Sequence, residues 1–345
     1  MSENHKQVAA ASDVAKLAGV SQSAVSRTFT EGASVSLKTR NKVIEAAQQL
    51  GYRPNLLARS LLKGKSNIVG VVLGNLENPF YSQILDVLST SLSAGGKRLL
   101  VFTVGANAEA DAQIDEMLQY RVDALILMST TLSSSLAKQC QSAGIPVVFL
   151  NRTGQFPECW AVTGDNQRGS HLIGKHLIDC GYQRIAFMAG YVDSSTSSER
   201  EQAFSQYIQE QGRPAPIREV GHFSRQGALA AARRLLALPQ PPDAIFCAND
   251  HMAMACLDVA KFEFDLEPGK DIGIVGFDDV SAASWPSFEL TTFSQPVALM
   301  AQKAAELIIN PALVSQQAEH FVVPGELLIR SSTVGKTTST INKLG

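Results

Sequence analysis

The sequence predicts an α/β protein in which a small all-α head precedes a larger core of two doubly wound parallel-sheet lobes. Three observations favour this class. A chain of 345 residues is longer than one hydrophobic core usually spans. Helical patterns fill the first 65 residues, whereas short apolar runs alternate with amphipathic stretches over residues 66–335. The composition, 45% hydrophobic and 18% charged, is that of an ordinary globular protein.

The charge is distributed unevenly along the chain. Residues 1–65 contain ten Lys or Arg residues and four acidic residues, a net charge of +6, whereas the remaining residues carry a net charge of −8. A compact basic segment suits a polyanion-binding module, because phosphate contacts need Lys and Arg gathered on one face. The charge alone does not distinguish a polyanion-binding module from a chance fluctuation of surface composition. The sequence motifs of this segment distinguish the two.

Several classes of protein are disfavoured. The sequence has no run of about 18 uncharged apolar residues and a polar start, MSENHKQ, so we expect a cytoplasmic protein that neither spans a membrane nor is secreted. The cysteines are odd in number and far apart, which argues against a disulfide framework or a structural zinc site. His171 and His176 are five residues apart and do not share a helix face, so we expect no metal site and no cofactor.

The first two helices of the head have clear start and stop signals. Ser12 is expected to cap the first helix, with Asp13 in its first turn, and Gly19 ends it. Ser21 is expected to cap a second short helix over residues 22–29. Two helices of about two turns joined by a Gly-containing turn form a helix-turn-helix, whose second helix enters the DNA major groove.

A third helix is expected to close the head. It begins after Ser36 and ends at Gly51, and its apolar stripe is formed by Val43, Ile44, Ala47 and Leu50. The break Tyr52-Arg53-Pro54-Asn55 follows, and then a short helical segment over residues 56–63. Because so short a helix is unstable alone, we expect it to order only against DNA or a second copy of the chain.

The runs SDVAKLAGVSQSAVSRTF and VSLKTRNKVIEAAQQLGYRPNLLARSLLKGKS resemble the head and hinge of the LacI/GalR family of bacterial transcription regulators. This resemblance implies a homodimer that reads a palindromic operator with paired helices and wedges a leucine from paired hinge helices into the minor groove. It implies base contacts by Gln22, Ser23 and Arg27. It implies phosphate or groove contacts by Ser21, Ser26, Asn55 and Arg59. Leu61 would be the leucine that wedges into the minor groove.

The head departs from the family pattern at three places. Ala10-Ala11 stands where the family usually has Thr-Ile, so Ser12 would have to replace the usual cap. Ala24 replaces a threonine and removes one hydroxyl from the DNA face, and Thr30 stands where an asparagine is common. DNA binding is therefore better supported than any single base contact.

The core contains eight apolar runs that predict buried parallel strands. They are Ile68 to Leu73, Leu99 to Val104, Ala124 to Met128, Val147 to Leu150, Ile185 to Ala189, Ile217 to Gly221, Ala244 to Cys247 and Ile272 to Gly276. Amphipathic stretches separate them, the break between the lobes falls near Gly164, and Leu290 to Gln295 should cross back.

These patterns predict four segments. They are a helix-turn-helix domain (1–53), a hinge helix and linker (54–65), an effector-binding core (66–335) and a flexible tail (336–345). The N-terminal lobe would comprise about 66–163 and 294–322, and the C-terminal lobe about 164–293 and 323–335. The tail has no leucine heptad, so a dimer is favoured over a tetramer built on a coiled coil.

Ligands of doubly wound sheets bind beyond the carboxyl ends of the strands, and with two lobes the cleft between them is the expected site. Planar polar side chains and aromatic rings gather there, which suits a hydroxyl-rich small ligand. The motifs NPFY, Ala248-Asn249-Asp250 and Gly276-Phe277-Asp278-Asp279 resemble the effector-binding core of the same family, a periplasmic-binding-protein-like fold.

The resemblance implies polar contacts by Arg200, Asn249 and Asp278. A pocket lining of Phe80, Tyr81, Phe223 and Gln295 would complete the site. Asn151-Arg152 resembles the Asp-Arg pair of sugar binders with one acceptor charge lost, so an anionic ligand such as a sugar acid would be tolerated. Simpler alternatives stay open: Asp250 could cap the helix at Met252, Asp279 could bond the following turn, and Tyr81 could be core.

The sequence thus predicts a transcription regulator, most simply a repressor, whose operator affinity responds to a sugar or sugar acid. An enzyme on the same scaffold lacks support, since GxSxG, a GxGxxG after the first strand, a Walker loop and HExxH are all missing. A transport-binding protein is disfavoured by the basic head and the lack of a signal peptide. A DNA-binding protein that keeps the core only as scaffold remains an alternative.

Overall fold

The computed structural model describes residues 9–30, 32–54, 65–74, 76–104, 111–128, 133–154, 156, 159–310 and 318–333. The chain forms two compact units, residues 1–66 and 67–345. The predicted hinge residues Asn55, Arg59 and Leu61 and the tail 336–345 lie outside the described residues.

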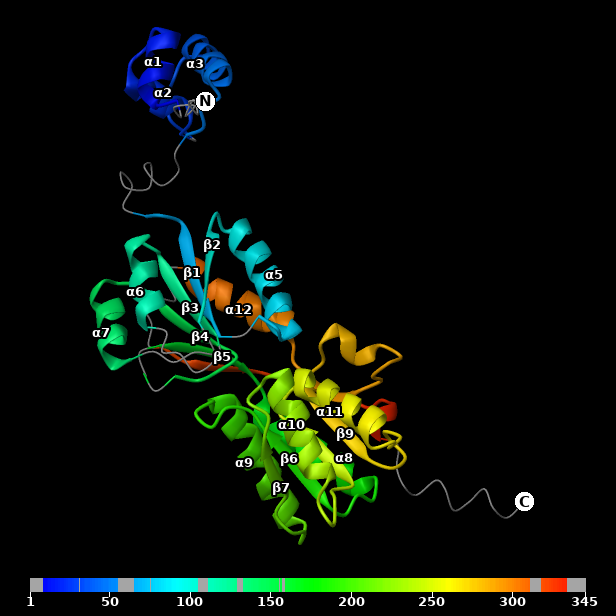
Figure 1. Cartoon of the computed structure of the whole chain (residues 1–345). Coiled ribbons are helices and arrows are strands. Elements are labelled where there is room, and N and C mark those ends of the chain that lie inside the picture. The colour runs from blue at the N-terminus through cyan, green and yellow to red at the C-terminus, as the bar shows by residue number, and fades with distance from the viewer. Residues whose placement is uncertain are drawn as a thin grey trace, which may run out of the picture. The chain divides into compact units, whose positions relative to one another are not determined.

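The head is a bundle of α1 (Ala11–Ala18), α2 (Gln22–Thr28) and α3 (Leu37–Leu50), drawn in blue in Figure 1. Ser21 and Ser36 cap α2 and α3 as predicted, because their hydroxyls accept backbone N–H groups of Ala24 and Thr39. Gly19 and Gly51 adopt left-handed conformations after α1 and α3. The buried core of the head is formed by Val14, Ala15, Ala18, Val25, Val43, Ala46 and Ala47.

Two expectations for the head are wrong. Ser12 does not cap α1: the helix begins one residue earlier with Ala10 as N-cap, and the Asp13 carboxylate accepts the Ala10 N–H at 2.8 Å. Ile44 and Leu50 are each 38% exposed, while Ala46 is buried in their place. Alanines of α1 and α3, which allow the helices to approach closely, contribute to the buried core instead.

The N-terminal lobe contains a six-stranded, fully parallel sheet in the order β11-β5-β4-β3-β1-β2. Its strands are β1 (Ile68–Leu73), β2 (Arg98–Thr103), β3 (Ala124–Met128), β4 (Val147–Leu150), β5 (Trp160–Gly164) and β11 (His320–Val323). The helices of this lobe are α5 (Pro79–Ala94), α6 (Asp111–Gln119), α7 (Ser134–Ser142) and α12 (Val297–Ile309).

The alternation of side chains in β1 shows that helices cover both faces of this sheet. Val69, Val71 and Leu73 join one buried cluster with apolar residues of α5 and α12, whereas Val72 joins a second with residues of α6 and α7. In Figure 1, α5 and α12 accordingly lie on one side of the sheet and α6 and α7 on the other. Near-continuous apolar strands are what such two-sided burial requires.

The C-terminal lobe contains a second six-stranded sheet in the order β12-β10-β9-β8-β6-β7, parallel except for the β10–β12 pair. Its strands are β6 (Ile185–Ala189), β7 (Ile217–Val220), β8 (Ala244–Cys247), β9 (Gly273–Asp278), β10 (Thr291–Ser294) and β12 (Glu326–Leu328). Its helices are α8 (Asn166–Asp179), α9 (Ser195–Glu210), α10 (Arg225–Leu236) and α11 (Asp250–Glu263), with short 3-10 turns at Ser281–Ser284 and Ser331–Thr333.

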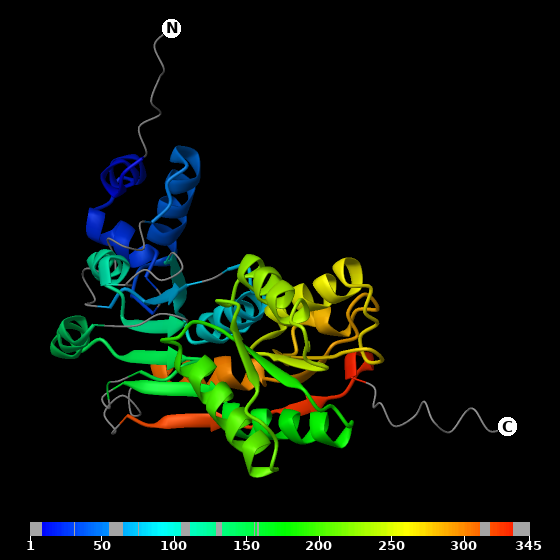
Figure 2. The same cartoon turned by 60° about the horizontal axis from the view of Figure 1, so that its bottom comes forward.

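All eight predicted strands are present, with ends shifted by two residues at most. The strands β5, β11 and β12, which lie next to chain crossings between the lobes, were not predicted. The segment expected to cross back first pairs with β9 as β10, and the chain crosses only afterwards, into α12. Figure 2, which views the molecule from a second direction, shows α12 and β11 in orange beside the green strands of the N-terminal lobe.

The cap of α1 provides a direct test of the corrected helix start. We expect Asp13→Ala to lower the free energy of unfolding of the head by about 0.5–2 kcal/mol, because the Ala10 N–H loses its acceptor. Ser12→Ala is the matched control and should change it by less than about 0.5 kcal/mol. Urea unfolding of a fragment spanning residues 1–66, followed by circular dichroism, measures both; a larger loss for Ser12→Ala would contradict the assignment.

Candidate functional site

The polar side chains of α2 form one exposed face. Ser21, Gln22, Ser23, Ser26 and Arg27 are all exposed, as the sequence predicted. Val25 and Thr28 point the other way and are 1% and 5% exposed, so they fix this face outward by anchoring the opposite side of the helix.

Local hydrogen bonds organise the beginning of α2. The hydroxyls of Ser21 and Ser23 lie 2.8 Å apart, and the Arg27 Nε donates to the Ser23 carbonyl at 3.3 Å. The Arg27 side chain therefore runs back along α2 toward the N-terminus of the helix. That end carries unpaired backbone N–H groups and a partial positive charge, which suits contact with an anionic backbone.

In the core, polar residues follow the carboxyl ends of strands in both lobes. Asn78 follows β1, Asn151 follows β4, Asn166 follows β5, Asn249 follows β8 and Gln295 follows β10. In each sheet the order reverses beside the first strand of the lobe, β1 or β6. Ligands of doubly wound sheets bind at such positions.

Arg200, on α9, is the centre of a buried polar network. It is 1% exposed, its Nε donates to the Asn166 Oδ1 at 2.9 Å, and its Nη1 lies 3.7 Å from the Asp278 Oδ1 and donates to the Ala248 carbonyl. Its guanidinium carbon lies 3.6 Å from the ring centre of Phe277. The arginine thus connects α8, α9, β8 and β9.

Asp278 joins residues that are far apart in the sequence. Its Oδ1 accepts the Gln295 amide at 2.6 Å, and Asn78, which caps α5 in the N-terminal lobe, also hydrogen-bonds to it. Burial raises the pKa of Asp278 to about 6, while Arg200, Gln295 and Asn78 act to lower the pKa. Asp278 and Asp279 have φ of 126° and 57°, a strained pair of residues of the kind found at binding sites.

Asp250 forms the second buried carboxyl of this region. Its Oδ1 accepts the Thr292 hydroxyl at 2.5 Å and its Oδ2 accepts the Val280 N–H at 2.9 Å. Burial, and then the nearby Asp278, raise the pKa of Asp250 to about 7. The suggestion that Asp250 caps α11 is wrong, since Asn249 is the cap and accepts the Met252 N–H at 2.9 Å. Asp279 pairs with Arg330 at 2.7 Å.

Contacts between the two lobes place Asn151 and Arg152 near Arg200. The Asn151 carbonyl accepts the Thr196 hydroxyl of α9 at 2.8 Å, and the Thr153 N–H donates to the Ser195 hydroxyl at 3.1 Å. Asn151 adopts φ of 60°, a conformation that asparagine tolerates better than most residues. The segment after β4 therefore reaches across to the first turns of α9.

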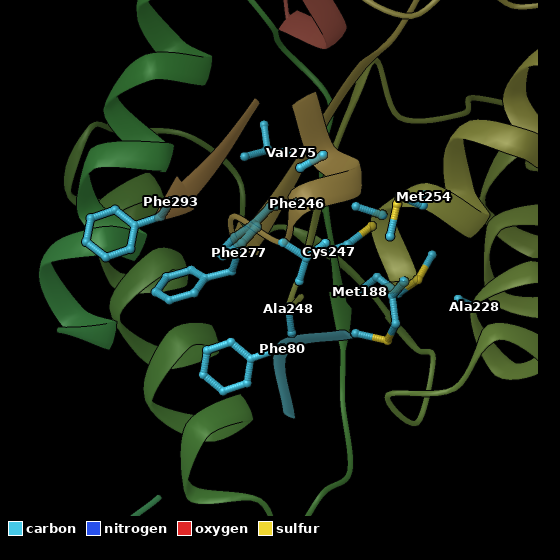
Figure 3. Close-up of a cluster of buried hydrophobic side chains, with 14 of the residues drawn as sticks. Phe80, Met188, Ala228, Phe246, Cys247, Ala248, Met254, Val275, Phe277 and Phe293 are labelled. Atoms are coloured by element: carbon cyan, nitrogen blue, oxygen red, sulfur yellow. The ribbon is translucent and has the colours of Figure 1, made fainter. Parts of the chain in front are cut away.

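The predicted aromatic residues differ in their surroundings. Phe80 is fully buried and belongs to the same apolar cluster as Phe277 and Phe293 (Figure 3). Its ring lies 5.5 Å from that of Tyr81, which is partly buried. Phe223 packs over Gly190, where a Cβ atom would lie 2.1 Å from the ring, so this close approach requires glycine.

Several buried polar atoms of the network have no hydrogen-bond partner within the described part of the chain. They include Asn151 Oδ1, Arg152 Nε, Arg200 Nη2 and Gln295 Oε1, all from predicted site residues. Unsatisfied buried polar atoms are costly and rare in folded proteins, so four in one region indicate a place for a bound molecule.

A surface cavity of about 410 Å³ lies elsewhere, on α8 and α9. It is lined by Asp165, Gln167, Arg168, His171, Leu172, Lys175 and Tyr207, none of which was predicted as a site residue. No cluster of potential metal ligands occurs among the described residues, and no described helix is long and apolar enough to span a bilayer.

The sequence did not single out Asn78 and Asn166 as site residues. Asn166 positions Arg200 and also donates to the Glu199 carboxylate at 2.7 Å. Recognition of β5 would have found it, because Asp165-Asn166 directly follows that strand. Asn78 lies within the quoted motif NPFY, but its contact with Asp278 spans two hundred residues and leaves no local signal.

Comparisons with known proteins agree with this architecture. The family described as bacterial regulatory proteins, lacI family, matches residues 12–55, and that described as periplasmic binding proteins and sugar binding domain of LacI family matches residues 66–329. The probable HTH-type transcriptional repressor ExuR of Bacillus subtilis is 31% identical over 94% of this chain and 98% of its own.

Two solved structures are similar over most of the chain. A lac repressor dimer bound to operator and the anti-inducer ONPF superposes with a TM-score of 0.82 and 28% identity over 95% of this chain and all of that one. A complex of the transcriptional regulator CelR with cellobiose has a TM-score of 0.70 and 27% identity over 94% of this chain and 99% of that one.

A helix-turn-helix head followed by a two-lobed α/β core defines a DNA-binding transcription regulator and not an enzyme. Both segments match the same family over nearly the whole length of the chain. The protein belongs to the LacI family of bacterial regulatory proteins.

The two buried carboxyls predict a pH dependence of stability. Both have pKa values above those of an unfolded chain, so between about pH 4 and pH 7 the folded core binds more protons and its free energy of unfolding falls as pH rises. We expect Asp250→Asn to reduce the fall between pH 5 and pH 8 by roughly 1–3 kcal/mol.

Urea unfolding followed by the fluorescence of Trp160 and Trp285, the two tryptophans of the chain, measures this slope. The slope is compared instead of the absolute stability, because the variant also weakens the bond to the Val280 N–H. Asp193→Asn, which changes an exposed carboxyl, serves as the matched control. An Asp250→Asn slope equal to that of the wild-type protein would refute a raised pKa at Asp250.

Proposed function

We propose that the protein is a cytoplasmic transcriptional repressor whose operator affinity is controlled by a small carbohydrate-like effector bound between the two lobes of its core. The observation that carries this proposal is the set of unpartnered, buried polar atoms between the lobes, in a chain that also presents an exposed polar helix face to DNA. A regulator with both features couples metabolite binding to transcription.

The exposed face of α2 is the proposed reading surface. Gln22 and Ser23 lie in the first turn, which enters the major groove in helix-turn-helix proteins, so they and Arg27 contact base edges. Ser21 and Ser26 contact phosphates and fix the orientation of the helix. The net charge of +6 over residues 1–65 supplies the sequence-independent part of the affinity.

The functional DNA-binding form is proposed to be a homodimer on a palindromic operator. The similar lac repressor structure is a dimer bound to operator, which supports this assembly. Residues 1–53 form the DNA-binding domain and residues 54–65 a hinge helix and linker. In the hinge, Asn55 and Arg59 contact the minor groove and Leu61 wedges between base pairs.

The effector site is proposed to consist of the residues gathered around Arg200. Arg200, Asp278, Asn249, Asn151, Arg152 and Gln295 provide its polar groups, and Phe80, Tyr81 and Phe223 provide its aromatic side. Because the Asn78–Asp278 and Asn151–Thr196 contacts join the lobes, a ligand held among them changes how the lobes close. Closure then orders or releases the hinge helices and alters the operator affinity.

A DNA-binding protein that keeps this core only as scaffold is the alternative. A scaffold without a ligand would gain nothing from buried polar atoms such as Arg200 Nη2 and Gln295 Oε1 that lack partners. These atoms favour the effector-controlled function.

Selection of bound duplexes from a random pool by the full chain tests the DNA-binding proposal. We expect enrichment of a symmetric site, and we expect Gln22→Ala to weaken binding to that site by about 1–3 kcal/mol while relaxing the preference at one position in each half-site. Gln48→Ala, an exposed glutamine on α3, is the matched control and should leave both unchanged. The absence of any symmetric enriched site would rule out the proposed operator recognition.

A further inference from the structure

Among the described residues, Arg152 and Arg200 are the two Lys or Arg side chains that are buried, at 9% and 1% exposure. Their surroundings differ sharply. Arg200 lies 3.7 Å from the Asp278 carboxylate and donates to Asn166 and to the Ala248 carbonyl. Arg152 forms no hydrogen bond and no ion pair with the described residues, and its Nε is buried without a partner. Arg152 is therefore a buried cation whose counter-charge is missing.

The electrostatic environment of Arg152 leads to the same conclusion. Burial lowers the pKa of its guanidinium, and within the described part of the chain the opposing influence comes from the Tyr81 phenol. At Arg200, by contrast, Asp278, Tyr81, Glu199 and Asp250 all oppose the effect of burial on the pKa. A buried charge without a counter-charge costs several kcal/mol, so the site is completed by an anion.

The neighbours of Arg152 suggest what else this anion must carry. Tyr81 influences both arginines, and the segment after β4 contacts Ser195 and Thr196 of α9, one turn before Arg200. The unpartnered atoms here comprise the acceptors Asn151 Oδ1 and Gln295 Oε1 and the donor Arg200 Nη2. Hydroxyl groups, which both donate and accept, can satisfy these three atoms.

We propose that the effector is a hydroxylated carboxylic acid, such as a uronate or an aldonate, and that Arg152 binds its carboxylate and selects it over neutral sugars. This inference rests on the proposed effector control. The hydroxyl groups donate to Asn151 and Gln295 and accept from Arg200, while the carboxylate supplies the charge that Arg152 lacks. Arginine suits this role because its planar fork matches a carboxylate.

Matched pairs of ligands test the carboxylate. Isothermal titration and thermal shift of the full chain would compare D-glucuronate with D-glucose, D-galacturonate with D-galactose and D-gluconate with D-glucitol. We expect at least one acid to bind about 10- to 150-fold more tightly than its neutral partner, the range for a hydrogen bond to a charged group. Neutral partners that bind as tightly as the acids would overturn the inference and leave the effector site standing.

Variants at Arg152 assign the selection to this residue. Arg152→Gln should abolish the preference, so that the acid binds no more tightly than its neutral partner. The ligand-free variant should melt no lower than the wild-type protein, because an unpaired buried charge is removed. Arg168→Gln, an exposed arginine on α8, is the matched control and should keep the preference. A preference that survives in Arg152→Gln would refute the role of Arg152.

A variant of Asn151 supplies the converse test. Asn151→Asp is nearly isosteric and adds a negative charge at the residue that precedes Arg152, so the binding preference should shift toward the neutral sugars. An unchanged preference for the acids would contradict the charge argument. If no member of the panel binds or stabilises the wild-type protein, both this inference and the proposed effector control fail, which separates that outcome from a failure of the carboxylate alone.

Discussion

The buried Arg200 guanidinium and the groups that satisfy it are the interaction on which the organisation of the core depends. A charge at 1% exposure is tolerated only where hydrogen bonds and an opposite charge replace water. Asn166, the Ala248 carbonyl and Asp278 provide this replacement. Asn166 begins α8, Ala248 directly follows β8, and Asp278 ends β9. The start of α8 and the carboxyl ends of β8 and β9 are thereby held at one point of the C-terminal lobe.

Asp278 extends this network from the C-terminal lobe to the N-terminal lobe. Asp278 accepts from Gln295, which precedes the crossing into α12, and from Asn78, which caps the first helix of the other lobe. Gly164 makes the arrangement possible, because a Cβ atom there would lie 2.3 Å from the Gln295 Oε1. A molecule that adds partners to this network acts on both lobes at once, which is the property a conformational switch needs.

Prediction from the sequence was most successful where the signal is local. The caps Ser21 and Ser36, the left-handed Gly51 and the eight apolar strands follow from hydrogen bonding and side-chain alternation within a few residues. The errors arose where tertiary packing decides. Ile44 has the right spacing for the core of the head but is 38% exposed, whereas Ala46, which was not predicted, is buried.

Only part of the site was predicted, because some of its residues are identified by long-range contacts alone. The sequence singled out Arg200, Asp278 and Gln295, and the structure brings these three together in one hydrogen-bonded network. The sequence did not single out Asn166, because the strand β5 that precedes it was not recognised. It also missed Asn78, whose partner Asp278 is two hundred residues away. Long-range hydrogen bonds leave no periodic trace in a sequence, so only the folded chain reveals them.

Reciprocal measurements of effector and operator binding distinguish a ligand-controlled regulator from a DNA-binding protein whose core is only a scaffold. Operator affinity of the full chain would be measured without and with saturating effector, and effector affinity without and with saturating operator, at one salt concentration. Thermodynamic linkage requires both affinities to change by the same factor, which we expect to be about 5- to 150-fold. An operator affinity that stays constant while the effector demonstrably binds would contradict the account.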